Sequence, residues 1–163
     1  MKKISMINLD ARTLRSLQQG TDEFCAEHRL SIGGSSSILL DVITQTTKLM
    51  TSVGGDSKWF GYLTLDVETR VIVGTCAFKG PPDHTRSVEI AYFTFPEYEH
   101  QGYATAMASM LVLAARSSPD VDHVIAHTLP EENASTHILR KLGMTCSGEV
   151  VDPEDGTVWR WCL

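Results

Sequence analysis

The sequence predicts a mixed α/β domain in which helices flank one central sheet. Apolar residues recur at helical spacing in the first third of the chain, and short segments rich in β-branched and aromatic residues follow in the middle. Helical and strand-like segments then alternate towards the C-terminus. The chain has 163 residues, of which 42% are hydrophobic and 21% charged. We therefore expect a single domain, residues 1–163, with a sizeable core.

The N-terminal part predicts three helices separated by turn-forming residues. Asp10 caps the first helix and Gly20 ends it. The second helix covers residues 22–28, and the glycine- and serine-rich segment 31–37 predicts a loop. The third helix ends at Gly54, and its apolar face is formed by Leu39, Val42, Ile43, Thr46 and Met50.

Strands and helices alternate in the remainder of the chain. A helix begins at Gly102, and a second helix is capped by Asn133 and ended by Gly143. The composition of the other segments predicts strands over residues 59–65, 70–78, 87–95, 121–128, 145–151 and 156–163.

Charge and hydropathy exclude several classes of protein. The formal net charge is −6, which argues against binding to nucleic-acid phosphates and is compatible with a cationic substrate such as an amine. No apolar run reaches the roughly 18 residues of a membrane span. The lysines of MKKISMINLD precede no apolar stretch typical of a signal peptide. We therefore expect a cytoplasmic protein with no nucleic-acid or membrane partner.

The cysteines and histidines predict no metal site. The four cysteines, at positions 25, 76, 146 and 162, show no C-x-x-C spacing, so we expect reduced thiols. His123 and His127 share one face of a predicted strand, but no third ligand follows at a suitable spacing.

The segment VEIAYFTFPEYEHQGYATA, residues 88–106, contains the most informative pattern. A strand leads into a polar loop, and a helix starts among small residues around Gly102. The first turn of a helix leaves backbone N–H groups without acceptors, and the helix dipole adds positive charge there. Because glycine has no side chain, an anion can approach the backbone closely. The same residues are also compatible with an ordinary tight turn that binds nothing.

Residues 99–104 resemble the acetyl-CoA pyrophosphate loop of GNAT N-acetyltransferases, Q/R-x-x-G-x-G/A. Gly102 and Ala104 match this motif, whereas Glu99 stands where the family has arginine or glutamine. A carboxylate there repels a pyrophosphate if it points towards it.

Two other segments extend the resemblance. Residues 133–144 are similar to the family segment N-x-x-S…L-x-K-L-G-F, with Asn133 one position closer to Ser135 than usual. Residues 72–82 look like the family's third strand and its exit. The chain is thus identified as resembling the GNAT superfamily, in the subgroup related to ribosomal-protein alanine N-acetyltransferases.

The resemblance implies the GNAT fold, with a mostly antiparallel sheet splayed between its fourth and fifth strands, here 88–95 and 121–128. It also implies acetyl-CoA as cosubstrate, no metal, and direct transfer to a primary amine in a ternary complex. The residues it assigns to acetyl-CoA are Phe93, Thr94, Phe95, His100, Gln101, Gly102, Tyr103, Ala104, Thr105, Asn133 and Ser135.

Glu89 is the candidate general base for deprotonating the amine. On a strand it shares a face with Ala91, Phe93 and Phe95, and an apolar face raises the pKa of a carboxylate. The family resemblance points to the same position, acting through water. A structural role for Glu89 is the alternative. The oxyanion donor is expected to be a backbone N–H near residues 93–95.

Several assignments stay open. Many relatives carry a tyrosine that protonates the CoA thiolate where this chain has Leu139, so another acid, water or an unprotonated thiolate is required. The acceptor is a protein N-terminus, an amino acid, a polyamine or an antibiotic. Homodimerisation is compatible with the resemblance. Because Glu99 and Leu139 depart from the family pattern, a non-catalytic acyl-CoA-binding module is the alternative hypothesis.

Overall fold

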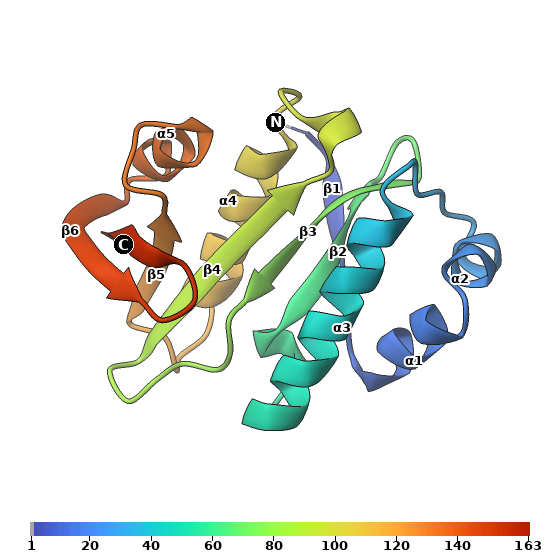
Figure 1. The fold of residues 1–163 in the computed structure, drawn as a ribbon, viewed down its shortest axis with the longest axis horizontal. Coiled ribbons are helices and arrows are strands. Elements are labelled where there is room, and N and C mark those ends of the chain that lie inside the picture. Colours follow the sequence, from blue (N-terminus) through green and yellow to red (C-terminus); the bar gives the residue numbers. More distant parts are fainter. Residues whose placement is uncertain (1) are drawn as a thin grey trace.

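The protein forms a seven-stranded sheet with helices on both faces, as described by a computed structural model of residues 2–163 (Figure 1). The strands lie in the order β1-β2-β3-β4-β5-β7-β6. Their bounds are β1 Ile4–Asn8, β2 Gly61–Asp66, β3 Val71–Phe78, β4 Ser87–Thr94, β5 His123–Thr128, β6 Thr145–Asp152 and β7 Gly156–Cys162.

The helices begin and end close to the predicted positions. They are α1 Ala11–Gln19, α2 Thr21–His28, α3 Ser36–Val53, α4 Tyr103–Arg116 and α5 Ala134–Lys141, with short 3-10 helices η1 Ser57–Trp59 and η2 Pro96–Tyr98. The predicted caps are confirmed: the Asp10 side chain accepts the N–H of Thr13, and that of Asn133 accepts the N–H of Thr136. The helices predicted from capping residues and apolar periodicity therefore form.

Two hydrophobic clusters hold the helices on the sheet. In Figure 1 α3 crosses the near face and α4 lies behind β4. One cluster joins Met107 and Leu111 of α4 to Leu139 of α5 and Trp161 of β7. The other cluster joins α1, α2 and α3 to β2, β3 and Phe95. The two faces of the sheet are thus covered separately, which produces the predicted mixed α/β architecture.

The N-terminal strand was not predicted from the sequence. β1 pairs antiparallel with β2, from Ile4 opposite Asp66 to Asn8 opposite Tyr62, and forms one edge of the sheet. Four of its five residues are only partly buried and Ser5 is exposed, which gives a weak local pattern. The strand is defined by its long-range partner instead.

The predicted splay between β4 and β5 is confirmed. Their parallel pairing spans three residue pairs, from Ser87 opposite His123 to Glu89 opposite Ile125. Beyond Glu89, β4 pairs only with β3, up to Thr94 opposite Gly74. All other neighbouring strands are antiparallel. We call residues 87–89 with 123–125 the closed end of the β4–β5 pair, and the part of β4 beyond Glu89 the open end.

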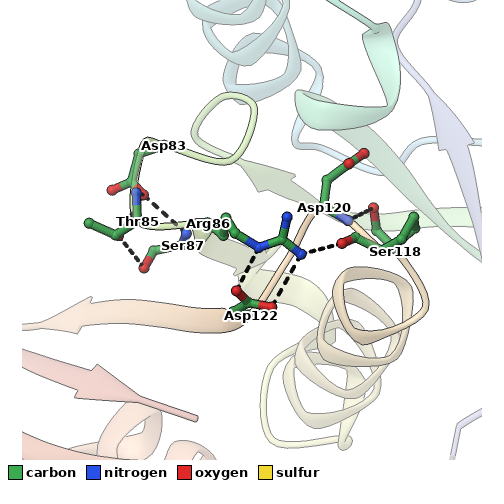
Figure 2. Close-up of polar contacts among 8 residues, drawn as sticks. Asp83, Thr85, Arg86, Ser87, Ser118, Asp120 and Asp122 are labelled. Carbon is green, nitrogen blue, oxygen red and sulfur yellow. Dashed lines mark hydrogen bonds and ion pairs between the residues drawn. The ribbon is translucent and has the colours of Figure 1, made fainter.

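A polar cluster flanks the closed end (Figure 2). The Arg86 guanidinium bonds both carboxylate oxygens of Asp122, through Nε at 2.5 Å and Nη2 at 3.2 Å, and also the carbonyl of Pro119. The Asp83 carboxylate accepts the backbone N–H of Ser87 at 3.0 Å. The β3–β4 and α4–β5 connections are thereby joined where the two strands begin.

Residues 2–163 contain no helix that is both long and apolar enough to cross a membrane. They also bring together no group of three histidine, cysteine or acidic side chains able to hold a metal ion.

Candidate active site

A groove of about 1080 Å³ lies on the face of the sheet that α3 covers. Its walls are α3, β3 and β4, and residues 152–154 at the turn between β6 and β7 line one part of it. Lys79 and Glu89 contribute to its lining, together with the acidic side chains of Asp41, Asp152 and Glu154. The groove therefore combines an apolar floor with charged groups that can orient a polar ligand.

Glu89 lies between two basic side chains. Its Oε1 is 2.9 Å from Nζ of Lys79 and 3.0 Å from Nδ1 of His127. The Glu89 side chain is 18% exposed and that of His127 is 15% exposed. The prediction that Glu89 has apolar surroundings is wrong, because the sheet register brings the ammonium of Lys79 and the imidazole of His127 next to its carboxylate.

The register explains this cluster. The backbone N–H of Lys79, directly after β3, donates to the carbonyl of Glu89 at 3.0 Å, so the two residues stand opposite one another. Ile125 stands opposite Glu89 on β5, and His127 is the next residue of β5 on that face. Neither Lys79 nor His127 was predicted to belong to the site, because strand register cannot be read from either segment alone.

Lys79 remains charged at neutral pH. Partial burial lowers its pKa, but the hydrogen bond and charge attraction to Glu89, with smaller effects of Asp152 and Asp155, raise the pKa of Lys79 above its ordinary value. The pKa of Asp152 is lowered, chiefly by backbone N–H groups of residues 155 and 154, with Lys79 and His127 adding charge attraction. An ammonium with a raised pKa holds its proton, so Lys79 cannot deprotonate an amine.

The open end of β4 presents a free edge. Antiparallel ladders alternate between bonded and non-bonded residue pairs. The N–H of Phe95 donates to the carbonyl of Val73 at 2.9 Å. The backbone N–H groups of Phe93 and Phe95 therefore both point towards β3. Among the three predicted oxyanion donors, only the N–H of Thr94 therefore faces away from β3. The Phe95 side chain is 0% exposed, so this residue offers neither its side chain nor its N–H to a ligand.

Two hydroxyl groups at the open end are buried, and residues 2–163 supply no hydrogen-bond partner for either. They are Tyr92 Oη and Thr94 Oγ1. Burial raises the pKa of Tyr92 to about 12, against a smaller opposite effect of the nearby Ser135 hydroxyl. Tyr92 thus reaches from β4 towards α5 across the gap where β5 has separated. Buried polar groups are normally bonded, so these two indicate a place where a ligand supplies the partner.

The loop before α4 has the backbone expected of an anion site. Gly102 caps α4 with a φ of 88°, and His100 has a φ of 58°. The N–H of Ala106 bonds the carbonyl of Gly102, so the N–H groups of the first turn, including those of Ala104 and Thr105, have no acceptor one turn back. Nothing lies within 4 Å of the place where a Gly102 side chain would begin. The helix start is open to an incoming group.

Tyr103 differs from its prediction. Its ring is 4% exposed and packs in the α4 core, and its hydroxyl donates to Asp66 Oδ2 at 2.6 Å. Its side chain therefore anchors α4 to the end of β2, and only its backbone N–H is available to a cofactor. Gln101 is exposed, and its side-chain amide donates to the carbonyl of Glu97 at 3.3 Å.

A contact between two loops was not predicted. Ser35, at the start of α3, donates its hydroxyl to Glu97 Oε2 at 2.7 Å. The Ser35 hydroxyl and backbone N–H groups lower the pKa of Glu97. The glycine- and serine-rich loop thus rests on the segment that leads into α4, while Glu99 is exposed.

The start of α5 is fixed by a capping box. Asn133 accepts the N–H of Thr136 at 3.0 Å, and Thr136 Oγ1 accepts the N–H of Asn133 at 3.0 Å. The Asn133 side-chain oxygen is thus used by the cap, and its amide N–H₂ is left to bind a ligand. Leu139 is 1% exposed and packs in the core.

Comparisons with known proteins agree with this architecture. Residues 39–145 match the family model described as the acetyltransferase (GNAT) domain. A search of curated proteins finds no significant match.

Among solved structures, the protein is similar to RimL, the ribosomal L7/L12 α-N-protein acetyltransferase in complex with coenzyme A, with 14% identity and a TM-score of 0.67 over 100% of this chain and 94% of that one. It also resembles ribosomal-protein-S5-alanine acetyltransferase from Vibrio fischeri, with 15% identity and a TM-score of 0.59 over 74% and 67% of the two chains. A GNAT acetyltransferase from Bacillus anthracis shows 19% identity and a TM-score of 0.56 over 63% of this chain and 64% of its own.

At these identities the structural neighbours establish the fold alone. The family model covers well over half of the chain, from α3 to the start of β6. The protein therefore belongs to the GNAT acetyltransferase family.

Proposed function

We propose that the protein is an N-acetyltransferase that uses acetyl-CoA and transfers the acetyl group directly to a primary amine. The observation that carries the proposal is the open end of β4, which begins directly after Glu89 and where the hydroxyls of Tyr92 and Thr94 are buried without a partner in residues 2–163. A cosubstrate inserted between β4 and β5 meets hydrogen-bonding groups that have no partner within residues 2–163.

The residues present fit acetyl-CoA. The N–H groups from His100 to Thr105, at the start of α4, are suited to its pyrophosphate, because the helix dipole and open backbone favour an anion there. The N–H of Thr94 and the hydroxyls of Tyr92 and Ser135 are suited to the pantetheine arm. When bound, acetyl-CoA supplies an acyl thioester.

Burial of the cysteine nearest the groove supports direct transfer. Cys76 lines the groove but is 2% exposed, and burial raises the pKa of its thiol to about 12. Such a thiol is not a nucleophile at neutral pH. The acceptor amine therefore attacks the thioester itself, in a complex that contains both substrates.

Calorimetric titration of acetyl-CoA tests the cosubstrate. The Gly102→Glu variant places a carboxylate at the helix start and strains a φ of 88°, so we expect it to lose detectable binding. Gly54→Glu is the matched control, because Gly54 also has a positive φ, 71°, and nothing within 4 Å, but ends α3 instead of starting α4. Equal binding by wild type and Gly102→Glu would contradict the proposed site.

Release of free thiol in the presence of amines tests the transfer. Spermidine and a peptide with an N-terminal alanine are suitable probes, since they represent a polyamine and a protein N-terminus. Tight binding of acetyl-CoA without amine-dependent thiol release would indicate a binding module instead of an enzyme.

A further inference from the structure

The inference concerns the proton that the acceptor amine must lose, and it rests on the proposed acetyl transfer. His127 lies two residues beyond Ile125, where the pairing of β4 with β5 stops. Its side chain points to the same face as Glu89, and Nδ1 is 3.0 Å from Glu89 Oε1. The imidazole therefore stands at the point where the two strands separate, on the face that carries the groove.

The contact with Glu89 selects one form of the imidazole. A carboxylate only accepts hydrogen bonds, so the neutral ring carries its proton on Nδ1. Nε2 then holds a free electron pair, and residues 2–163 place no hydrogen bond on it. A carboxylate that fixes the tautomer of a histidine in this way makes the second nitrogen an available base.

Glu89 is already engaged by two neighbouring side chains. Its Oε1 lies 2.9 Å from the ammonium of Lys79 and 3.0 Å from Nδ1 of His127. An imidazole changes its protonation between about pH 5 and 8, the range in which a general base operates.

We propose that His127 Nε2 takes the proton of the acceptor amine and that Glu89 is a positioning residue which orients the imidazole. The amine nitrogen forms a bond to the carbonyl carbon of the thioester, and the carbon–sulfur bond breaks. The electron pair of that bond leaves with the sulfur as the CoA thiolate. The nitrogen's proton passes to Nε2, and the resulting imidazolium, paired with Glu89, returns it to solvent, from which the thiolate is protonated.

The charged groups around His127 come from four strands or their ends. Glu89 on β4 and Asp152 at the end of β6 are acidic, and Lys79 after β3 is basic. Arg160 stands opposite His127 on β7, and its buried Nε has no hydrogen-bond partner in residues 2–163. Two acidic and two basic side chains therefore surround the imidazole.

The first test is the pH dependence of kcat/KM with acetyl-CoA and the better of the two amine probes. We expect a wild-type rate that rises between about pH 5 and 8, and a His127→Gln variant that is about 10²- to 10⁴-fold slower and has lost this rise. Glu89→Gln is expected to be slower but to keep the rise. His123→Gln is the matched control, since His123 lies on the same face of β5 and is exposed, and it should leave the profile unchanged.

Two further readouts separate a base from a structural residue. Nitrogen-15 NMR of the free wild-type protein should show His127 protonated on Nδ1 when neutral. Added imidazole should restore part of the activity of His127→Ala. A His127→Gln enzyme with the wild-type rate and pH profile, or a neutral ring protonated on Nε2, overturns the inference. Absence of transfer by the wild-type protein overturns the proposed function, and this inference with it.

Discussion

The two ends of the β4–β5 pair are built from the same two strands but are stabilised in opposite ways. At the closed end, backbone pairing from Ser87 to Glu89 is reinforced by Arg86, whose guanidinium bridges Asp122 and the carbonyl of Pro119 (Figure 2). At the open end β4 no longer pairs with β5, and the hydroxyls of Tyr92 and Thr94 are buried without a partner among the described residues 2–163.

The two ends should therefore contribute differently to the stability of the fold. An unsatisfied buried polar group costs about 1–3 kcal/mol, so we expect the open end to contribute less to stability than the closed end. The backbone of β4 is held there by β3 alone, whose Gly74 stands opposite Thr94. We therefore expect the open end to depend strongly on the contact with β3, and the closed end to tolerate loss of its exposed ion pair.

The largest predicted effect is that of Gly74→Ala at the open end. A Cβ on Gly74 would lie 2.3 Å from the Phe93 carbonyl oxygen and 3.0 Å from the Thr94 Cα, both in the β4 backbone. Because backbone cannot move aside like a flexible side chain, we expect a loss of about 3 kcal/mol in the free energy of unfolding, measured by urea denaturation.

Gly61→Ala is the control for this substitution. A Cβ on Gly61 of β2 also meets close atoms, at 2.9 Å from Thr46 Oγ1 and 3.1 Å from Leu9 Cδ1, but these belong to side chains. We expect a smaller loss. Equal losses for the two variants would show that the β3–β4 contact is no more rigid than the packing of α3 on β2.

The sequence predicted much of the fold because most elements carry local signals. Asp10, Gly20 and Gly54 marked helix ends, and the splay was implied by the family resemblance and confirmed by the register. β1 was missed because its five residues are an edge strand defined by β2. Local patterns fix an element's type, whereas an edge strand of this length is fixed by its partner.

The candidate site was predicted less completely. Glu89 and the loop around Gly102 were identified from motifs, but the partners of Glu89 depend on register between three strands. The same limit applies to Tyr103, which was placed near the cofactor although its side chain turns into the core. A motif locates a residue along the chain, and the direction of its side chain depends on packing that the motif does not encode.

A second prediction concerns the anchor of the helix that follows the open end. Tyr103→Phe removes the buried hydroxyl that donates to Asp66 Oδ2. The pKa of Asp66 is lowered from 3.8 to about 2. The hydrogen bond from Tyr103 makes the largest contribution, and backbone N–H groups of residues 69 and 68 add smaller ones. We expect a loss of about 2 kcal/mol in the free energy of unfolding at neutral pH, since the bond is made to a charged group.

The difference in stability between wild type and Tyr103→Phe should depend on pH. A lowered folded-state pKa adds stability that is fully present above the unfolded pKa near 3.8 and lost as pH falls towards about 2. The gap between wild type and Tyr103→Phe should therefore shrink between about pH 4 and 2. Tyr62→Phe is the control, because the Tyr62 hydroxyl donates to the backbone carbonyl of Lys58, and a backbone carbonyl does not titrate. A gap that stays constant with pH would contradict the role of Asp66.

The smallest predicted effect is that of Arg86→Gly at the closed end. Arg86 and Asp122 are about half exposed, so solvent and salt screen their attraction, and such pairs contribute little to stability. Arg86 also has a φ of 60°, which glycine adopts more readily, so the substitution relieves backbone strain while it removes the ion pair.

Thermal unfolding at low and high salt measures this prediction. We expect Arg86→Gly to unfold close to the wild-type temperature, with any difference shrinking at high salt. Lys3→Ala, which removes an exposed pair with Glu68 at the far edge of the sheet, should behave alike. A loss as large as that of Gly74→Ala would mean that the bridge from Arg86 to Asp122 and Pro119 holds β4 against β5. The closed end would then depend on its side chains as much as the open end depends on β3.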